Sequence, residues 1–168
     1  MTLLWWLLGF VVLQRLFELA HARRNERRLR AAGALEHGSG HFPLIVLLHV
    51  AWLVSIGLFV PADTQPSWRL FGLFAVLQLA RLWVLVSMGR YWTTRVLTLP
   101  GAPLVRRGPY RWVRHPNYLI VVGEIAVLPL IFGAWQIALV FSVANAILLA
   151  WRIRIEDAAL APRRNAGA

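Results

Sequence analysis

The chain has 168 residues, 59% of them hydrophobic, and a mean hydropathy of +0.61, which is too apolar for a soluble domain of this length. Its net charge of +11 comes from arginine, because all 18 basic residues are Arg. The charge lies between apolar segments, where membrane topology and lipid headgroups account for it, so no nucleic-acid partner is expected. Cysteine is absent, which excludes a disulfide framework, a thiolate nucleophile and a Cys-based metal site.

Apolar runs of membrane-spanning length predict an all-α fold, a polytopic membrane helical bundle in a single integral membrane domain, residues 1–168. The first run lacks a basic leader and a small-residue cleavage site, so we interpret it as a retained span. A short last connection at Gly133 and Ala134 predicts a C-terminal helical hairpin. About five spans are expected, at residues 3–20, 43–60, 69–88, 118–132 and 135–151.

Charged side chains inside the spans require partners, because a charge in lipid is costly. Arg15 and Glu18 are three residues apart and are expected to pair with each other. Glu124 lies two turns into the fourth span, and Arg81 or the arginines of the central loop are its expected partners. Whether Glu124 serves packing or chemistry is left open by the sequence.

The distribution of arginine predicts the orientation of the bundle. Segments 21–42, 88–117 and 151–168 hold 15 of the 18 arginines, and with five spans all three segments fall on one side of the membrane. The positive-inside rule places that side in the cytoplasm, with the N-terminus outside and the C-terminus inside.

The segment RRGPYRWVRHPNYL, residues 106–119, is the first candidate for a functional site. A positive-inside loop would explain its arginines, but not the His115-Pro116 pair or the tyrosines on either side of it. Asn117 is a candidate N-cap for the fourth helix, whose positive end would favour an anion nearby.

The second candidate segment is NAILLAWRIRIEDAAL, residues 145–160. Arg152 and Glu156 are four residues apart and share one helical face, with Asn145 two turns below. On a solvated surface such a pair would be worth only a few tenths of a kcal/mol. However, one segment starts the fourth helix and the other ends the fifth, so both are expected at the same membrane depth.

Together the two segments suit a ligand that has both a carboxylate and a cation. Arginine and histidine can hold the carboxylate, and Glu156 or Asp157 can hold an ammonium group. Tyr110, Trp112 and Tyr118 can stack on a flat heterocycle or face a sulfonium. S-adenosylmethionine has all of these parts.

The two segments also carry a family resemblance. LVRRGPYRWVRHPNYL followed by RIRIEDAAL resembles the isoprenylcysteine carboxyl methyltransferase family of integral membrane enzymes, from about Trp83 to the C-terminus. The resemblance implies S-adenosylmethionine in a cytoplasm-facing pocket, and a lipophilic acceptor that enters from the bilayer. Arg152 and Glu156 would be catalytic, where methyl donor and acceptor meet. The cofactor-binding residues would be Tyr110, Arg114, His115, Pro116, Tyr118 and Glu156. Asp157 stands where many members have a second Glu.

The resemblance implies O-methylation of a membrane-embedded acceptor, either an isoprenylcysteine-like carboxylate or a lipid-linked phenol such as an alkylresorcinol or alkylpyrone. A carboxylate acceptor would need only a cation such as Arg152 to place it. A phenol, with a pKa of about 10, would also need a base, and Glu156, His115 or Glu124 could serve. The short chain is similar to bacterial members, which implies a bacterial inner membrane.

Three alternatives remain open: a phospholipid N-methyltransferase, an NADPH-dependent membrane reductase, and a non-enzymatic protein whose loops bind anionic membrane lipid. No metal site is expected, because Gly38-Ser39-Gly40 between His37 and His41 argues against a helix that would align the two histidines. The oligomeric state is not predicted.

Overall fold

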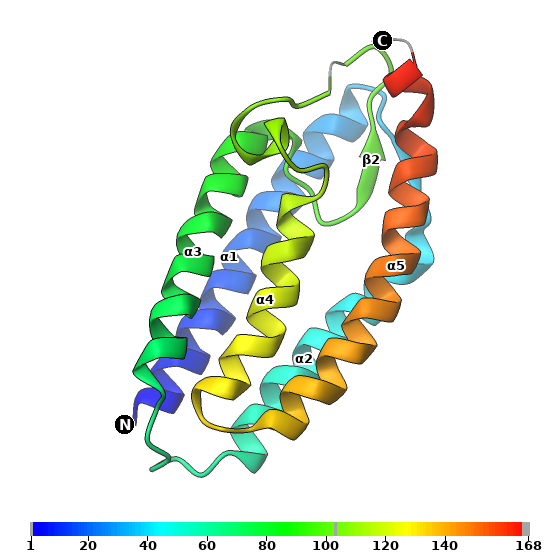
Figure 1. Ribbon diagram of the computed structural model, residues 1–168. Helices are drawn as coiled ribbons and strands as arrows, with labels where there is room; N and C mark the ends of the chain where they lie inside the picture. The colour runs from blue at the N-terminus through cyan, green and yellow to red at the C-terminus, as the bar shows by residue number, and fades with distance from the viewer. Residues whose placement is uncertain (1, 103, 166–168) are drawn as a thin grey trace.

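The computed structural model describes residues 2–102 and 104–165. Over these residues it contains five long helices that run alternately up and down, side by side (Figure 1). The helices are α1 (Leu3–Ala31), α2 (Phe42–Phe59), α3 (Trp68–Met88), α4 (Pro116–Ile131) and α5 (Trp135–Asn165). Four of them are long and apolar enough to cross a membrane, and α4 is a shorter apolar helix of 16 residues. The prediction of an all-α membrane bundle of about five helices is confirmed.

The packing of the bundle follows from which helix faces are apolar. Helix α4 packs between α3 and α5, and α5 packs in turn against α2. Trp52 and Ile56 of α2 and Leu128 of α4 are fully buried in the shared core. The outer faces are also apolar: Phe17 and Leu58 are each 73% exposed. In lipid such faces need no cover, because the hydrocarbon is as apolar as they are.

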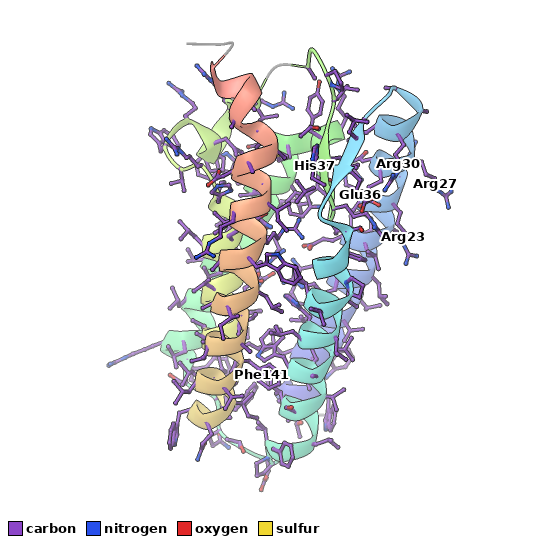
Figure 2. All side chains as sticks on the ribbon, turned by 90° about the vertical axis from the view of Figure 1, so that its right-hand side faces the viewer. Arg23, Arg27, Arg30, Glu36, His37 and Phe141 are labelled. Carbon is purple, nitrogen blue, oxygen red and sulfur yellow. The ribbon has the colours of Figure 1, made fainter. Side chains whose placement is uncertain are left out.

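Helix α1 is longer than the predicted span 3–20, because the basic segment that follows continues the helix to Ala31. Ala22, Asn25, Glu26 and Leu29 are buried and lie on one helical face, since they recur at three- and four-residue spacing. The arginines of this segment take the other face, and Figure 2 shows three of them, Arg23, Arg27 and Arg30, on the outside of α1. The segment is therefore an amphipathic extension of the helix.

Helix α5 extends beyond the predicted span 135–151. It passes Pro162 and ends at Asn165. A proline removes one helical hydrogen bond, but here the loss falls in the last turn of the helix.

A short antiparallel sheet that the sequence did not indicate connects two of the loops. Strand β1 (Leu35–His37) pairs with β2 (Val96–Thr98), with Glu36 opposite Leu97. The His37 ring and the Thr98 hydroxyl are hydrogen-bonded, at 2.7 Å between Nε2 and Oγ1. Helix α5 lies against both strands, so the sheet closes the end of the bundle where α1 and α5 finish (Figure 1).

The three arginine-rich segments lie at this same end of the bundle, with the end of α5 (Figure 1). The opposite end holds the 60–67 connection and the turn between α4 and α5. That turn, at Phe132–Ala134, closes the predicted C-terminal hairpin.

A buried ionic cluster connects three helices within the membrane. Arg81 of α3 donates hydrogen bonds to Glu124 of α4 through Nε, at 2.7 Å, and to Glu18 of α1 through Nη1, at 3.0 Å. Arg15 binds both carboxylates, and the Gln78 amide donates to Glu124 at 2.9 Å. The expected Arg15–Glu18 and Arg81–Glu124 pairs are therefore both formed, within one cluster of two positive and two negative charges.

Candidate functional site

A cavity of about 460 Å³ lies at the arginine-rich end of the bundle, between the segment that follows α3, the start of α4 and the end of α5. Six residues predicted for the site line this cavity: Tyr110, Arg114, His115, Tyr118, Arg152 and Glu156. Pro116 is not among the lining residues. It is buried at the first position of α4, where its fixed φ angle favours the start of a helix.

The Tyr118 hydroxyl is the centre of the polar wall. It accepts a hydrogen bond from Arg152 Nε, at 2.8 Å, and donates one to Glu156 Oε2. The Arg152 guanidinium also lies 5.6 Å from the centre of the Tyr118 ring. Arg152 and Glu156 are thus joined through Tyr118, and no direct ion pair between the two is found in the described part of the chain. The phenol holds a cation and an anion side by side at the cavity surface.

His115 completes this group by stacking on Tyr118. The two rings are 5.2 Å apart between centres and inclined by 13°. The ring nitrogens of His115 face the two acidic side chains of α5: Nε2 lies 3.3 Å from Asp157 Oδ1, and Nδ1 lies 3.7 Å from Glu156 Oε1. The RHPNY segment at the start of α4 and the RIRIED segment of α5 are therefore in contact. Both are expected from the sequence at the same membrane depth.

The prediction that Asn117 caps α4 is wrong. The helix begins at Pro116, which puts His115 in the N-cap position and Asn117 in the first turn. Asn117 instead lines the cavity, and its Oδ1 atom is buried without a hydrogen-bond partner among the described residues. A buried acceptor of this kind is costly unless it is paired, so it suits a ligand that donates an N–H group.

Tyr110 is held against the cavity by a short 3₁₀ helix, η3 (Gly108–Arg111). Arg107, just before η3, fastens this segment to α3 by donating from Nε to the Ser87 carbonyl, at 2.7 Å. Burial, and secondarily the charge of Glu156, raises the pKa of Tyr110 above its ordinary value. Tyr110 therefore stays a neutral phenol at working pH and can stack or donate a hydrogen bond.

Sequence reasoning missed part of the site. Half of the described lining residues come from segment 91–106, where Tyr91 ends a short 3₁₀ helix, η2 (Gly89–Tyr91), and Trp92 follows it. Two adjacent aromatic residues shortly after the predicted span 69–88 could have indicated that this segment belongs to the site. Leu29 and Ala34 also line the cavity, and no local pattern marks them.

Glu124 and Asn145 are not part of the cavity wall. Glu124 is 2% exposed and is bound by the ionic cluster. Asn145 is buried on α5, below Arg152. Within the described residues no group of three His, Asp or Glu side chains could hold a metal ion. The side chain of His41 lies outside the described part.

The residues that line the cavity combine several kinds of chemical group. Its volume is within the ~300–1,000 Å³ typical of small-molecule sites. It offers arginines for a carboxylate, Glu156 for a cation, several aromatic faces and the unpaired Asn117 oxygen.

Comparisons with known proteins agree with this description. Residues 70–162 match the family model of the isoprenylcysteine carboxyl methyltransferase (ICMT) family. The uncharacterized protein YpbQ of Bacillus subtilis is 42% identical over 160 residues, which cover 93% of this chain and 95% of YpbQ. An uncharacterized protein of Haemophilus influenzae is 30% identical over 155 residues, 87% of this chain and 88% of that protein. No solved structure matches.

Proposed function

Since this chain belongs to the isoprenylcysteine carboxyl methyltransferase family, we propose that it is an S-adenosylmethionine-dependent O-methyltransferase with a lipophilic, membrane-embedded acceptor. The observation that carries the proposal is the Tyr118 hydroxyl, which joins Arg152 and Glu156 at one cavity wall. The two halves of the family signature thereby supply a cation, an anion and an aromatic stack to one small-molecule cavity.

Bound S-adenosylmethionine would supply an electrophilic methyl group on its sulfonium. Arg114 would hold the carboxylate of the amino-acid end, because it lines the cavity and its side chain is exposed. Glu156 would hold the ammonium group, and Asn117 Oδ1 would accept a hydrogen bond from an N–H group. Tyr110 and the stacked His115–Tyr118 pair offer aromatic faces for the adenine and the sulfonium.

Arg152 would orient the acceptor. An acceptor carboxylate is already ionised, so it needs only placement in line with the methyl group, which the guanidinium of Arg152 can provide. A phenolic acceptor would also have to lose a proton, and Glu156 and His115 are the bases that line the cavity. Glu124, the third base considered, is enclosed in the ionic cluster and cannot reach an acceptor there.

We also propose where the protein acts. Both relatives come from bacteria, and the arginine-rich end of the bundle, which carries the cavity, is expected to face the cytoplasm of a bacterial inner membrane. S-adenosylmethionine would then enter from the cytoplasm and the acceptor from the bilayer.

The first experiment measures binding of S-adenosylhomocysteine to detergent-purified protein by calorimetry. Wild type is compared with Arg152→Gln, Glu156→Gln and the matched control Arg154→Gln, since Arg154 is exposed on α5 away from the cavity. We expect micromolar binding to wild type and to Arg154→Gln, and binding weakened about tenfold or more in Glu156→Gln. Folded wild-type protein that binds no S-adenosylhomocysteine would refute the proposal.

The second experiment identifies the reaction. Methyl-labelled S-adenosylmethionine is incubated with the protein and with lipid extracts, and the labelled product is separated by the atom that carries the methyl group. We expect label on oxygen in a lipid-soluble product, and its loss in Arg152→Gln. Label on the nitrogen of a phospholipid headgroup would instead indicate an N-methyltransferase, and competition by NADPH for the cavity would indicate a reductase.

A further inference from the structure

One wall of the cavity is a segment with little regular structure of its own. Of the 22 described residues that line the cavity, eleven lie between Tyr91 and Arg106. Over its described residues, this stretch contains only the end of the 3₁₀ helix η2 (Gly89–Tyr91) and the three-residue strand β2. Such a segment cannot hold its shape by internal hydrogen bonds alone. The shape of the cavity therefore depends on hydrogen bonds and contacts that other parts of the chain make with this wall.

Asn25, on the extension of α1, fastens the start of the wall. Its side chain is 2% exposed. The Nδ2 group donates to the Gly89 carbonyl at 3.1 Å and to the Trp92 carbonyl at 2.9 Å, and lies 3.2 Å from His21 Nε2. One amide group thus bonds to both ends of the turn that places Tyr91 and Trp92 at the cavity.

Glu26, the next residue, fastens the continuation of the wall. Its Oε1 atom accepts hydrogen bonds from the backbone N–H of Thr94, at 3.3 Å, and from the Thr94 hydroxyl, at 3.0 Å. Its Oε2 atom lies 3.9 Å from Arg95 Nε, while Nη1 of Arg95 binds Glu36 at 2.6 Å. Glu26 is 8% exposed, so these bonds are little weakened by water.

We propose that Asn25 and Glu26 are positioning residues for the cofactor cavity. Neither lines the cavity, and both lie before residue 70, where the family match begins. The extension of α1 is then a support that holds residues 89–95 in the shape that the ligand requires, so the N-terminal helix completes the site. The identity of the ligand rests on the proposed function, but the support itself does not.

The proposal is tested on the full-length protein in detergent with two readouts. The first is hydrogen–deuterium exchange of the backbone amides of residues 89–95, and the second is the dissociation constant for S-adenosylhomocysteine. Asn25→Asp keeps the side-chain shape but turns the donor into an acceptor that faces two carbonyls. We expect exchange at 89–95 to rise about tenfold and the dissociation constant to rise by a similar factor, with exchange in α3 and α4 unchanged.

Matched variants separate positioning from general stability. Glu26→Gln keeps an oxygen that can accept from Thr94 and is expected to stay close to wild type in both readouts, whereas Glu26→Ala is expected to resemble Asn25→Asp. The exposed Arg27, which points away from the bundle (Figure 2), provides the control Arg27→Ala, expected to change neither readout. Should Asn25→Asp or Glu26→Ala unfold, Thr94→Val removes the hydroxyl hydrogen bond to Glu26 from the side of the wall, and Thr94 does not line the cavity.

Unchanged exchange at residues 89–95 in Asn25→Asp and Glu26→Ala would overturn the proposal, as would unchanged affinity in variants whose wall exchanges faster. Failure of wild type to bind S-adenosylhomocysteine would instead count against the proposed function. The exchange measurement would still decide whether the extension of α1 supports the wall.

Discussion

Gly108 shows how strictly single residues define the cavity. Its φ angle is +58°, and a Cβ atom at this position would lie 2.0 Å from the Ser87 hydroxyl oxygen and 2.9 Å from Ser87 Cβ. Both facts require glycine, because other residues rarely adopt this conformation and the neighbouring α3 leaves no room. The close approach positions η3, and with it Tyr110, against the cavity.

We therefore expect Gly108→Ala to displace η3, to weaken binding of S-adenosylhomocysteine strongly, and to cost about 1–3 kcal/mol of stability through strain and overpacking. Calorimetry and thermal unfolding in detergent measure the two effects. The control is Gly72→Ala in α3, where an added Cβ would meet nothing within 4 Å and a helical glycine gains from the change. Equal behaviour of the two variants would contradict this account of Gly108.

At the residue scale the sequence predicted the cavity residues that sit in compact motifs. Tyr110, His115 and Tyr118 stand out because a short segment concentrates them without a topological need. Asn25 and Glu26 did not stand out, because they lie inside an arginine-rich run and their partners are 64 to 68 residues away in the chain. Local spacing cannot reveal a hydrogen bond of that range.

The ionic cluster belongs to the scale of the elements, since it binds α1, α3 and α4 together inside the membrane. Glu124→Gln would leave the positive charges of Arg81 and Arg15 opposed by Glu18 alone. We expect the free energy of unfolding of Glu124→Gln to fall by about 3–5 kcal/mol, because an uncompensated charge would remain buried. Thermal unfolding in detergent measures the loss.

Removal of a complete pair from the same cluster is the control. Arg81→Met with Glu124→Leu leaves Arg15 and Glu18 as a neutral pair, so we expect most of the stability to return. At temperatures where all variants are folded, affinity for S-adenosylhomocysteine should change little, because neither residue lines the cavity. A double variant as unstable as Glu124→Gln would show that the charges act in some other way.

The Glu36 carboxylate is expected to make the stability of the β1–β2 sheet depend on pH. Burial works to raise the pKa of Glu36, but hydrogen bonds and charge from Arg30 and Arg95 outweigh it, so the pKa is lower than usual; Figure 2 shows Glu36 close to Arg30. The ionised Glu36 carboxylate therefore contributes its full stabilisation of the folded state above the unfolded-state pKa of about 4.3. That contribution is lost as the pH falls through the lower pKa of the folded state. The protection factor of the amides of residues 35–37, which compares their exchange with the intrinsic rate at the same pH, should fall over that range in wild type. In Glu36→Gln the protection factor should be low and insensitive to pH.

The sequence predicts helix lengths and connections where the thickness of the lipid bilayer determines them. Apolar runs marked the spans, and the short 132–134 turn marked the hairpin. The extension of α1 was not recognised, because its buried face is built from Ala, Asn, Glu and Leu, which carry a weak apolar signal between arginines. Strands of three residues contain too few alternations to be distinguished from loop, so the sheet could not be predicted.

At the scale of the whole molecule, the uneven distribution of arginine gives the bundle two different ends. Three chain segments that are far apart in sequence bring 15 of the 18 arginines to the end with the cavity. That residues 1–168 form one integral membrane domain stays a prediction, as do the lipophilic acceptor and the membrane lipid partners. The two ends nevertheless make the proposed orientation directly testable.

The absence of cysteine makes that test clean, because any single cysteine introduced is the only labelling site. Gln65 is exposed in the 60–67 connection and Arg27 is exposed at the opposite end. We expect a membrane-impermeant maleimide to label Gln65→Cys in intact cells, and to label Arg27→Cys only after the membrane is permeabilised. The reason is that arginines beside helix ends are retained on the cytoplasmic side. The reverse pattern would place the cavity outside the cell, away from the cytoplasmic supply of its proposed cofactor, and would contradict both the orientation and the methyltransferase proposal.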